Sequence, residues 1–154
     1  MAAFYTEGLC FECQRCSSCC GKVPRFVYLS KRDLLTLSRF YSLHPVHFVM
    51  HYCRWADYYH GTTVLALKEK SNHDCILWNN GCEAYPARPL QCSTYPFWTW
   101  MLKDRETWDD CAKDCPGMNR GKWWSPGKIA ELSRRFSENI PLQKENFNKM
   151  FPGC

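Results

Sequence analysis

The chain has 154 residues, 12 cysteines and a formal net charge of +5. This length suits one domain with a hydrophobic core, and no stretch is long and apolar enough to span a membrane. The first residues, MAAFYTEGLCFECQ, lack the basic and apolar regions of a secretory signal. We therefore expect a cytoplasmic protein whose thiols stay reduced and bind metal.

The positive charge is weak evidence for a nucleic-acid partner. Four thiolates around a zinc ion or a cubane cluster leave a net charge of about −2 per site. Two filled sites would therefore bring the protein near neutrality. We expect an unidentified protein partner, and neither nucleic acid nor membrane. The sequence does not indicate the oligomeric state.

Four cysteines lie within eight residues near the start of the chain: Cys13, Cys16, Cys19 and Cys20. A C-x2-C turn curls back and directs both sulfurs to one centre, so this run predicts a metal or iron–sulfur site. Neighbouring side chains on an extended backbone diverge, so Cys19 and Cys20 are expected to serve two centres or two edges of one cluster. A disulfide framework is the alternative, and a reducing compartment disfavours it.

Two helices are predicted after a short β-prone segment at residues 26–29. Ser30 and Asp33 resemble a capping box, and the apolar spacing that follows predicts a helix that ends before Pro45. Pro45 then starts a second helix over about residues 45–55. His47 and His51 share one face of it, but no Glu follows His47 as in a metalloprotease motif, so we expect a polar or partly buried helix face in place of metal ligation.

A strand is predicted over residues 62–68, followed by a hairpin. Cys75 and Cys82 flank Asn79-Asn80-Gly81, and an Asn-Gly step is the strongest short hairpin signal. The two thiols should therefore lie near each other, as two metal ligands at the mouth of a hairpin. Pro89 next predicts a short helix that carries Cys92 and ends before Pro96.

Aromatic residues are expected to shield a site from water beyond this helix: Phe97, Trp98 and Trp100. Nucleobase stacking is the alternative, but these rings do not interleave with basic residues. Cys111 and Cys115 are expected in a loop. Ser125 and Pro126 predict the cap and first residue of a last helix, and residues 141–154 are expected to form a mobile tail.

These elements predict an α+β fold. We expect a small single cysteine-rich domain, rich in loops, with several short helices and a β-hairpin, stapled by a metal or iron–sulfur site. The cysteine-cluster domain would span residues 1–125, and residues 126–154 would form a C-terminal helix and tail packed on it.

The order of these motifs resembles the YkgJ-type cysteine-cluster family (CxxCxxCC), which is described as zinc- or iron-chelating. The resemblance covers about residues 11–125. It is carried by Phe11-x-Cys13-x2-Cys16-x2-Cys19-Cys20, by Cys75 and Cys82, by Tyr85-x2-Arg88-Pro89-x2-Cys92-x2-Tyr95-Pro96-Phe97, and by Cys115-x-Gly117. It implies eight metal ligands: Cys13, Cys16, Cys19, Cys20, Cys75, Cys82, Cys92 and Cys115.

Two positions depart from the family pattern without removing a ligand. Ser17 stands where glycine is common, and Ser93 stands where an arginine would add a cation. Cys10 leaves an alternative open, because Cys10-x2-Cys13-x2-Cys16-x3-Cys20 has the spacing of a bacterial ferredoxin run. We keep Cys10 as a candidate and expect no metal role for the other three cysteines outside the pattern: Cys53, Cys111 and Cys154.

The cysteine spacing also bears on the identity of the metal and on the function. C-x2-C-x2-C suits three corners of a [4Fe–4S] cluster, with zinc as the alternative cofactor. The expected function is metal binding in electron transfer, cluster handling or metal homeostasis. One alternative is an enzyme or accessory in protein modification, since the cysteine segment is similar to one in flagellin lysine-N-methylases; another is a zinc-stabilised interaction module. No catalytic constellation is recognised, so enzyme activity stays open.

Overall fold

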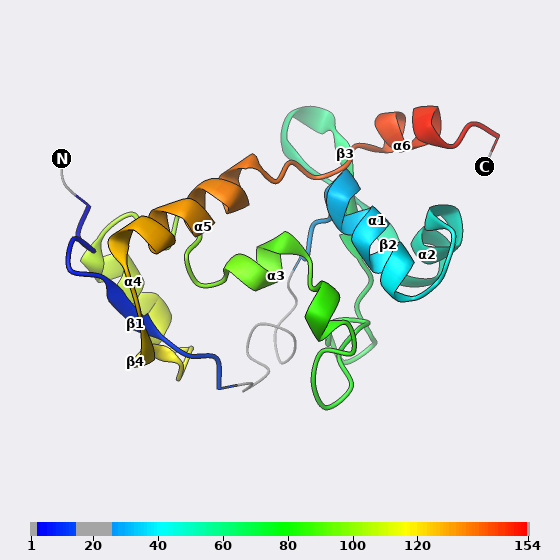
Figure 1. Cartoon of the computed structure of the whole chain (residues 1–154). Helices are drawn as coiled ribbons and strands as arrows, with labels where there is room; N and C mark the ends of the chain where they lie inside the picture. Colours follow the sequence, from blue (N-terminus) through cyan, green and yellow to red (C-terminus); the bar gives the residue numbers. More distant parts are fainter. Residues whose placement is uncertain (1–2, 15–25, 154) are drawn as a thin grey trace. The chain divides into compact units, whose positions relative to one another are not determined.

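The structure is a computed structural model that describes residues 3–14 and 26–153 (Figure 1). Helices alternate along the chain with small two-stranded antiparallel sheets, which confirms the predicted α+β class. The chain divides into two compact units: Met1–Ser18 with Thr94–Glu138, and Cys19–Ser93 with Asn139–Cys154. Each unit is described by itself below, and the predicted boundary at residue 125 stays a prediction.

The first unit combines a two-stranded sheet with two helices. Its elements are β1 (Leu9–Phe11), α4 (Arg105–Ala112), β4 (Met118–Trp124) and α5 (Pro126–Glu138). β1 pairs with β4 with a shift of register after Cys10, so that Phe11 lies opposite Met118. The core is aromatic, and Phe97 stacks on the fully buried Trp108 at 5.9 Å between ring centroids. Phe97 therefore belongs to this core.

One helix of this unit was predicted and one was not. The Ser125 hydroxyl accepts the N–H of Lys128 at 3.1 Å, and Pro126 opens α5 as expected. α4 occupies a segment expected to be a loop around Cys111, so that expectation was wrong. Its N-cap is Asp104, whose carboxylate accepts the N–H of Thr107 at 2.7 Å. An Asp before a polar first turn is an ordinary helix-start signal, and it could have revealed α4.

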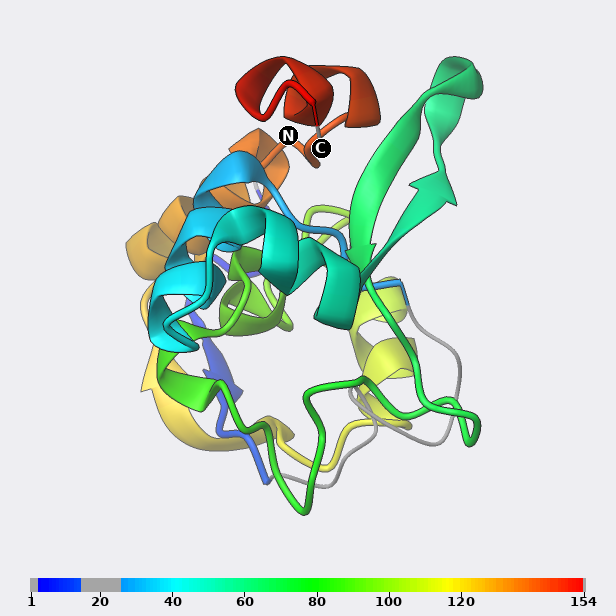
Figure 2. The same cartoon turned by 90° about the vertical axis from the view of Figure 1, so that its right-hand side faces the viewer.

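The second unit builds its core from aliphatic residues. Its elements are α1 (Lys31–Phe40), α2 (Pro45–Tyr52), β2 (Cys53–Asp57), β3 (Thr63–Leu67) and α6 (Lys144–Met150), with short 3-10 helices η1 (Tyr59–Gly61) and η2 (Tyr85–Ala87). α3 (Leu90–Thr94) ends one residue beyond the unit. Figure 2 shows the β2–β3 hairpin beside α1 and α2. Leu29, Leu34 and Leu65 are completely buried between these elements.

The predicted capping box at the start of α1 is confirmed. The Ser30 hydroxyl accepts the N–H of Asp33, and the Asp33 carboxylate accepts the N–H of Ser30, both at 3.1 Å. α2 begins at Pro45 as predicted but ends at Tyr52, earlier than expected. The chain turns there into β2, which pairs residue by residue with β3, and that tertiary pairing overrides the local helical pattern.

The C-terminal segment is packed, so the prediction of a mobile tail was wrong. The N–H of Leu142 donates to the carbonyl of Leu29, and the carbonyl of Leu142 accepts the N–H of Leu65, both at 2.9 Å. α6 follows and buries Phe147 against the same core. Two apolar residues thus anchor the segment. None of the helices in the described part of the chain combines the length and apolar character of a membrane span.

Candidate metal centre

The predicted ligand cysteines divide into three groups. Three lie outside the described residues: Cys16, Cys19 and Cys20. Two lie in the first unit: Cys13 and Cys115. Three lie in the second unit: Cys75, Cys82 and Cys92.

A tight turn brings the segments of Cys75 and Cys82 together. Asn80 and Gly81 adopt positive φ angles of 54° and 139°, and the N–H of Asn79 donates to the carbonyl of Gly81 at 2.8 Å. Trp78 and Cys82 then pair as an isolated antiparallel bridge. The predicted turn is therefore confirmed, although its flanks form a single bridge in place of two strands.

Cys75 is a partly buried thiol with a backbone hydrogen bond. Burial raises its pKa to about 11; the N–H of Leu77 donates to the sulfur and lowers the pKa, and the neighbouring Cys82 raises it. Cys75 therefore stays protonated at neutral pH, and a metal ion must displace its proton. A backbone N–H directed at the sulfur is an arrangement that stabilises a bound thiolate.

Cys92 lies on α3, which starts directly after Pro89 as predicted. The N–H of Cys92 donates to the carbonyl of Pro89 at 2.9 Å, and the N–H of Leu90 donates to the buried Asp33 carboxylate at 3.0 Å. All three cysteines of this unit pack on its single core cluster: Cys75, Cys82 and Cys92. Asp33 thus connects the ligand-bearing helix α3 to the start of α1.

Three buried groups of this unit have no hydrogen-bond partner in the part of the chain that the structure describes: Ser38 Oγ, Tyr41 Oη and Arg88 Nε. Tyr41 packs on the same core as the cysteines, and its pKa rises to about 12 through burial first, with Glu83, Tyr52, Cys82 and Cys75 adding to the shift. The Arg88 guanidinium lies over the Tyr85 ring at 3.8 Å, between Cys82 and Cys92 in the sequence. Metal-bound thiolates would supply acceptors for such donors, so these residues fit a thiolate-ligated metal.

In the first unit, a glycine lets the Cys13 and Cys115 segments approach closely. The N–H of Glu12 donates to the carbonyl of Gly117 at 3.0 Å. A Cβ atom on Gly117 would lie 2.3 Å from the Glu12 carbonyl oxygen, so only glycine fits. Cys115 is buried and Cys13 is exposed. The close packing of Gly117 against Glu12 therefore explains the glycine in the Cys115-x-Gly117 motif.

The remaining cysteines and histidines occupy other environments. Cys10 lies in β1 opposite Trp123, and Cys53 is a buried apolar thiol whose pKa burial raises to about 12. His47 and His51 are exposed on α2 and form a polar face, not a partly buried one. Within residues 3–14 and 26–153, no three His, Cys, Asp or Glu side chains are grouped so that they could hold a metal ion. The eight-ligand set therefore stays a prediction.

Sequence reasoning missed the role of two polar side chains. Tyr41 continues the helical spacing of Leu34 and Leu37, and that position was itself a signal, because a Tyr on an apolar face must bury its hydroxyl. Gln91 binds backbone far away in the sequence, at Phe26 and Tyr28, and carried no local signal.

A family model described as "CxxCxxCC: Putative zinc- or iron-chelating domain" matches residues 12–116. The match includes every cysteine in the predicted ligand set. No solved structure matches the chain.

Proposed function

Because the chain belongs to the CxxCxxCC family of zinc- or iron-chelating domains, we propose that its cysteine thiolates hold an iron–sulfur cluster, with zinc as the second candidate. The observation that carries the proposal is the Cys75–Cys82 pair, which shares one core with the Tyr41 hydroxyl, a buried donor without an acceptor among the described residues. A thiolate pair would give this donor an acceptor.

The two candidate metals are favoured by different features. The C-x2-C-x2-C run of Cys13, Cys16 and Cys19 suits three corners of a cubane, which favours [4Fe–4S]. The turn that joins Cys75 and Cys82, with an N–H directed at the Cys75 sulfur, favours a zinc knuckle. A cluster would supply one-electron transfer, whereas zinc would supply a structural crosslink.

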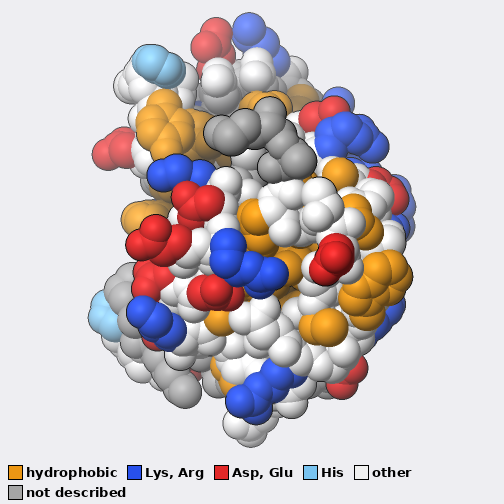
Figure 3. Space-filling view, turned by 90° about the vertical axis from the view of Figure 1, so that its left-hand side faces the viewer, with side chains coloured by type: hydrophobic (Ala, Val, Ile, Leu, Met, Phe, Trp, Pro, Cys, Tyr) orange, Lys and Arg blue, Asp and Glu red, His pale blue; other side chains and the backbone are white. Residues whose placement is uncertain are grey.

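We propose a cytoplasmic role in electron transfer, cluster handling or metal homeostasis, with an unidentified protein partner. On the face shown in Figure 3, basic side chains lie among acidic ones, and we propose no nucleic-acid partner. Reversible one-electron reduction would favour electron transfer over a zinc-stabilised interaction module.

The test is the absorption spectrum and elemental content of protein purified without oxygen, with iron, sulfide and zinc measured on one sample. Broad visible absorption with matching iron and sulfide is expected for a cluster; a colourless zinc protein would place zinc first. The variants Cys75→Ser and Cys82→Ser should lose metal, whereas Cys111→Ser, the matched control, should keep it. Wild-type protein with neither metal would contradict the proposal.

A further inference from the structure

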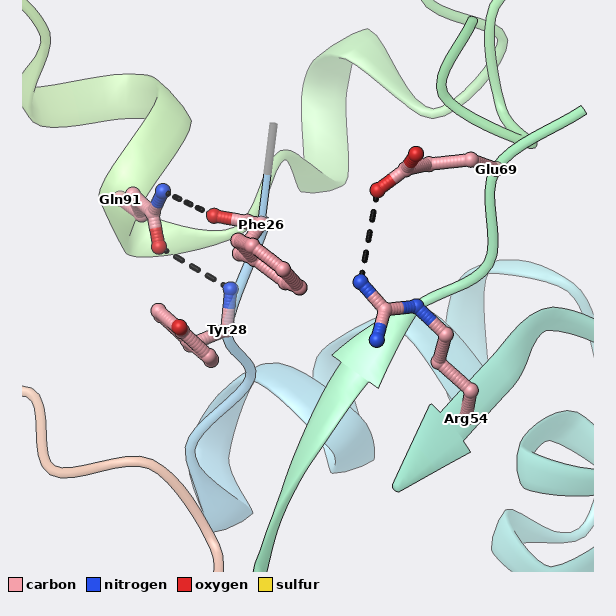
Figure 4. A network of polar contacts seen from close by, with 5 residues as sticks. All are labelled: Phe26, Tyr28, Arg54, Glu69 and Gln91. Carbon is pink, nitrogen blue, oxygen red and sulfur yellow. Dashed lines mark hydrogen bonds and ion pairs between the residues drawn. The ribbon is translucent and has the colours of Figure 1, made fainter. Parts of the chain in front are cut away.

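The side chain of Gln91 holds a distant backbone segment by both of its polar atoms (Figure 4). Its Nε2 donates to the carbonyl of Phe26 at 2.8 Å, and its Oε1 accepts the N–H of Tyr28 at 3.0 Å. Reversing the amide would set N–H against N–H and oxygen against oxygen, so the partners determine its orientation. Gln91 therefore binds the backbone of this segment with one donor and one acceptor, as a neighbouring β-strand would.

Phe26 is also held from its ring side. The Arg54 guanidinium lies 4.7 Å from the ring centroid of Phe26, and its Nη2 pairs with Glu69 Oε1 at 3.3 Å (Figure 4). Glu69 in turn pairs as a β-bridge with Cys75. Phe26 is thus contacted twice: Gln91 of α3 binds its carbonyl, and Arg54 of the β2–β3 hairpin lies over its ring.

Each end of this network lies beside a predicted metal ligand. Gln91 directly precedes Cys92, Glu69 pairs with Cys75, and Phe26 follows Cys20 by six residues in the sequence. All five network residues belong to the second unit: Phe26, Tyr28, Arg54, Glu69 and Gln91. Their contacts add to backbone pairing, because Tyr28 forms a β-bridge with Ala66 of β3, the strand that pairs with β2.

We propose that Gln91 and Arg54 are positioning residues for the metal centre, which hold the Cys92 and Cys75 segments in place around Phe26. This inference rests on the proposed function and names residues that set the affinity of that same site. Ligands held in place before binding lose less conformational freedom when the metal binds, and the affinity rises accordingly.

The network is built to affect metal affinity more than the stability of the fold. The Arg54 and Glu69 side chains keep 32% and 20% of their surface exposed, and ion pairs of that kind contribute little to stability. The buried core of this unit is built mainly from aliphatic residues, with Leu29 and Leu65 completely buried. A purely structural role would instead lower stability and affinity together.

The test compares Gln91→Met with Gln143→Met. Methionine keeps the length of glutamine and removes both hydrogen bonds; Gln143 lies in the same unit, at the N-cap of α6, where its side chain makes no capping bond. Co²⁺ is titrated into reduced, metal-free protein without oxygen, and thiolate-to-cobalt absorption reports binding. We expect about tenfold weaker Co²⁺ affinity for Gln91→Met, a nearly unchanged urea midpoint of the metal-free protein, and wild-type behaviour for Gln143→Met.

A double-mutant cycle with Arg54→Met tests whether Phe26 is the common point. Since both side chains act on Phe26, the second loss of Co²⁺ affinity should be smaller than the first. Wild-type affinity in Gln91→Met, or a lower urea midpoint without weaker binding, would overturn the positioning role while the metal proposal stands. Fully additive losses would overturn the shared point. Wild-type protein that binds no Co²⁺ through thiolates would overturn the positioning role, whereas the proposed function fails only if wild-type protein purified without oxygen contains neither iron with sulfide nor zinc.

Discussion

At the scale of single residues, the second unit contains polar groups that are buried without full hydrogen bonding. Leaving a buried donor unsatisfied costs about 1–3 kcal/mol, so such groups need a reason. In the described part of the chain they belong to three residues: Ser38, Tyr41 and Arg88. Tyr41 packs on the core that also carries Cys75 and Cys82.

Replacing Tyr41 by Phe removes one hydroxyl and keeps the ring. The metal-free protein should be as stable as wild type, or more stable by about 1 kcal/mol, because an unsatisfied buried donor disappears. Metal affinity should fall, by up to about tenfold, because a donor to a thiolate is lost. Ser38→Ala is the control, since it removes another buried, acceptor-free hydroxyl from α1. Equal metal affinity in both variants would contradict a role for Tyr41.

Because the thiol of Cys53 is buried, we expect the folded protein to become less stable at alkaline pH. Its thiol is 4% exposed, and burial raises its pKa from 9.0 to about 12. The folded state thus holds its proton more tightly than the unfolded state. The stabilisation is complete below pH 9.0 and disappears as pH rises towards about 12, with a slope of at most about 1.4 kcal/mol per pH unit for one group.

Urea unfolding of reduced, metal-free protein at increasing pH measures this slope. Cys53→Ala should flatten it without abolishing it, because Tyr41 and Cys75 also have raised pKa values and contribute in the same direction. An identical slope in wild type and Cys53→Ala would show that Cys53 titrates normally.

At the scale of elements, the first unit depends on close backbone contact between β1 and the turn before β4. The carbonyl of Gly117 accepts the N–H of Glu12, and Met118 pairs with Phe11 one residue further. This contact joins the segment that enters the cysteine run to the segment that carries Cys115. Its register therefore controls where Cys13 and Cys115 lie within the unit.

Gly117→Ala should destabilise the protein by about 1–3 kcal/mol, because the new Cβ would overlap the Glu12 carbonyl oxygen and force the backbone apart. Gly127→Ala is the control within the same unit. Gly127 lies in α5, where a Cβ meets no atom within 4 Å, so alanine should stabilise the helix by up to about 1 kcal/mol. Thermal unfolding of both variants measures the difference, and equal effects would refute the steric argument.

At the scale of the whole molecule, each compact unit has a hydrophobic core of its own. The first core is built around Trp108 and Phe97, and among the predicted ligands that the structure describes only Cys115 belongs to it. The second is built around leucines on α1, β3 and the C-terminal segment. A bound metal would therefore add stability to units that already have hydrophobic cores.

Removal of the metal by chelation under reducing conditions should lower the melting temperature, because a ligand that binds only the folded state stabilises it. The near-UV circular dichroism of the buried Trp108 should persist, since this ring packs on Phe97 within the hydrophobic core of its own unit. Apo protein reloaded with metal is the control. Complete loss of the near-UV signal on chelation would mean that metal binding and folding are one equilibrium.

Much of the local structure followed from the sequence, because its signals act within one helical turn. Ser30 with Asp33 marked the start of α1, Pro45 that of α2, and Ser125 with Pro126 that of α5. Asn-Gly likewise marked the turn between Cys75 and Cys82. The cysteine spacing was specific enough to indicate the family, which residues 12–116 confirm.

Tertiary structure alone decided the features that depend on partners far apart in the chain. β1 pairs with β4 across more than a hundred residues, and Leu142 joins Leu29 and Leu65, which no local pattern announces. Gln91 finds its acceptor at Phe26 for the same reason. A capping side chain meets its partner because the two are close in the chain, whereas these groups meet only after the core has formed. Their contacts therefore depend on the tertiary structure and cannot be predicted from the neighbouring residues.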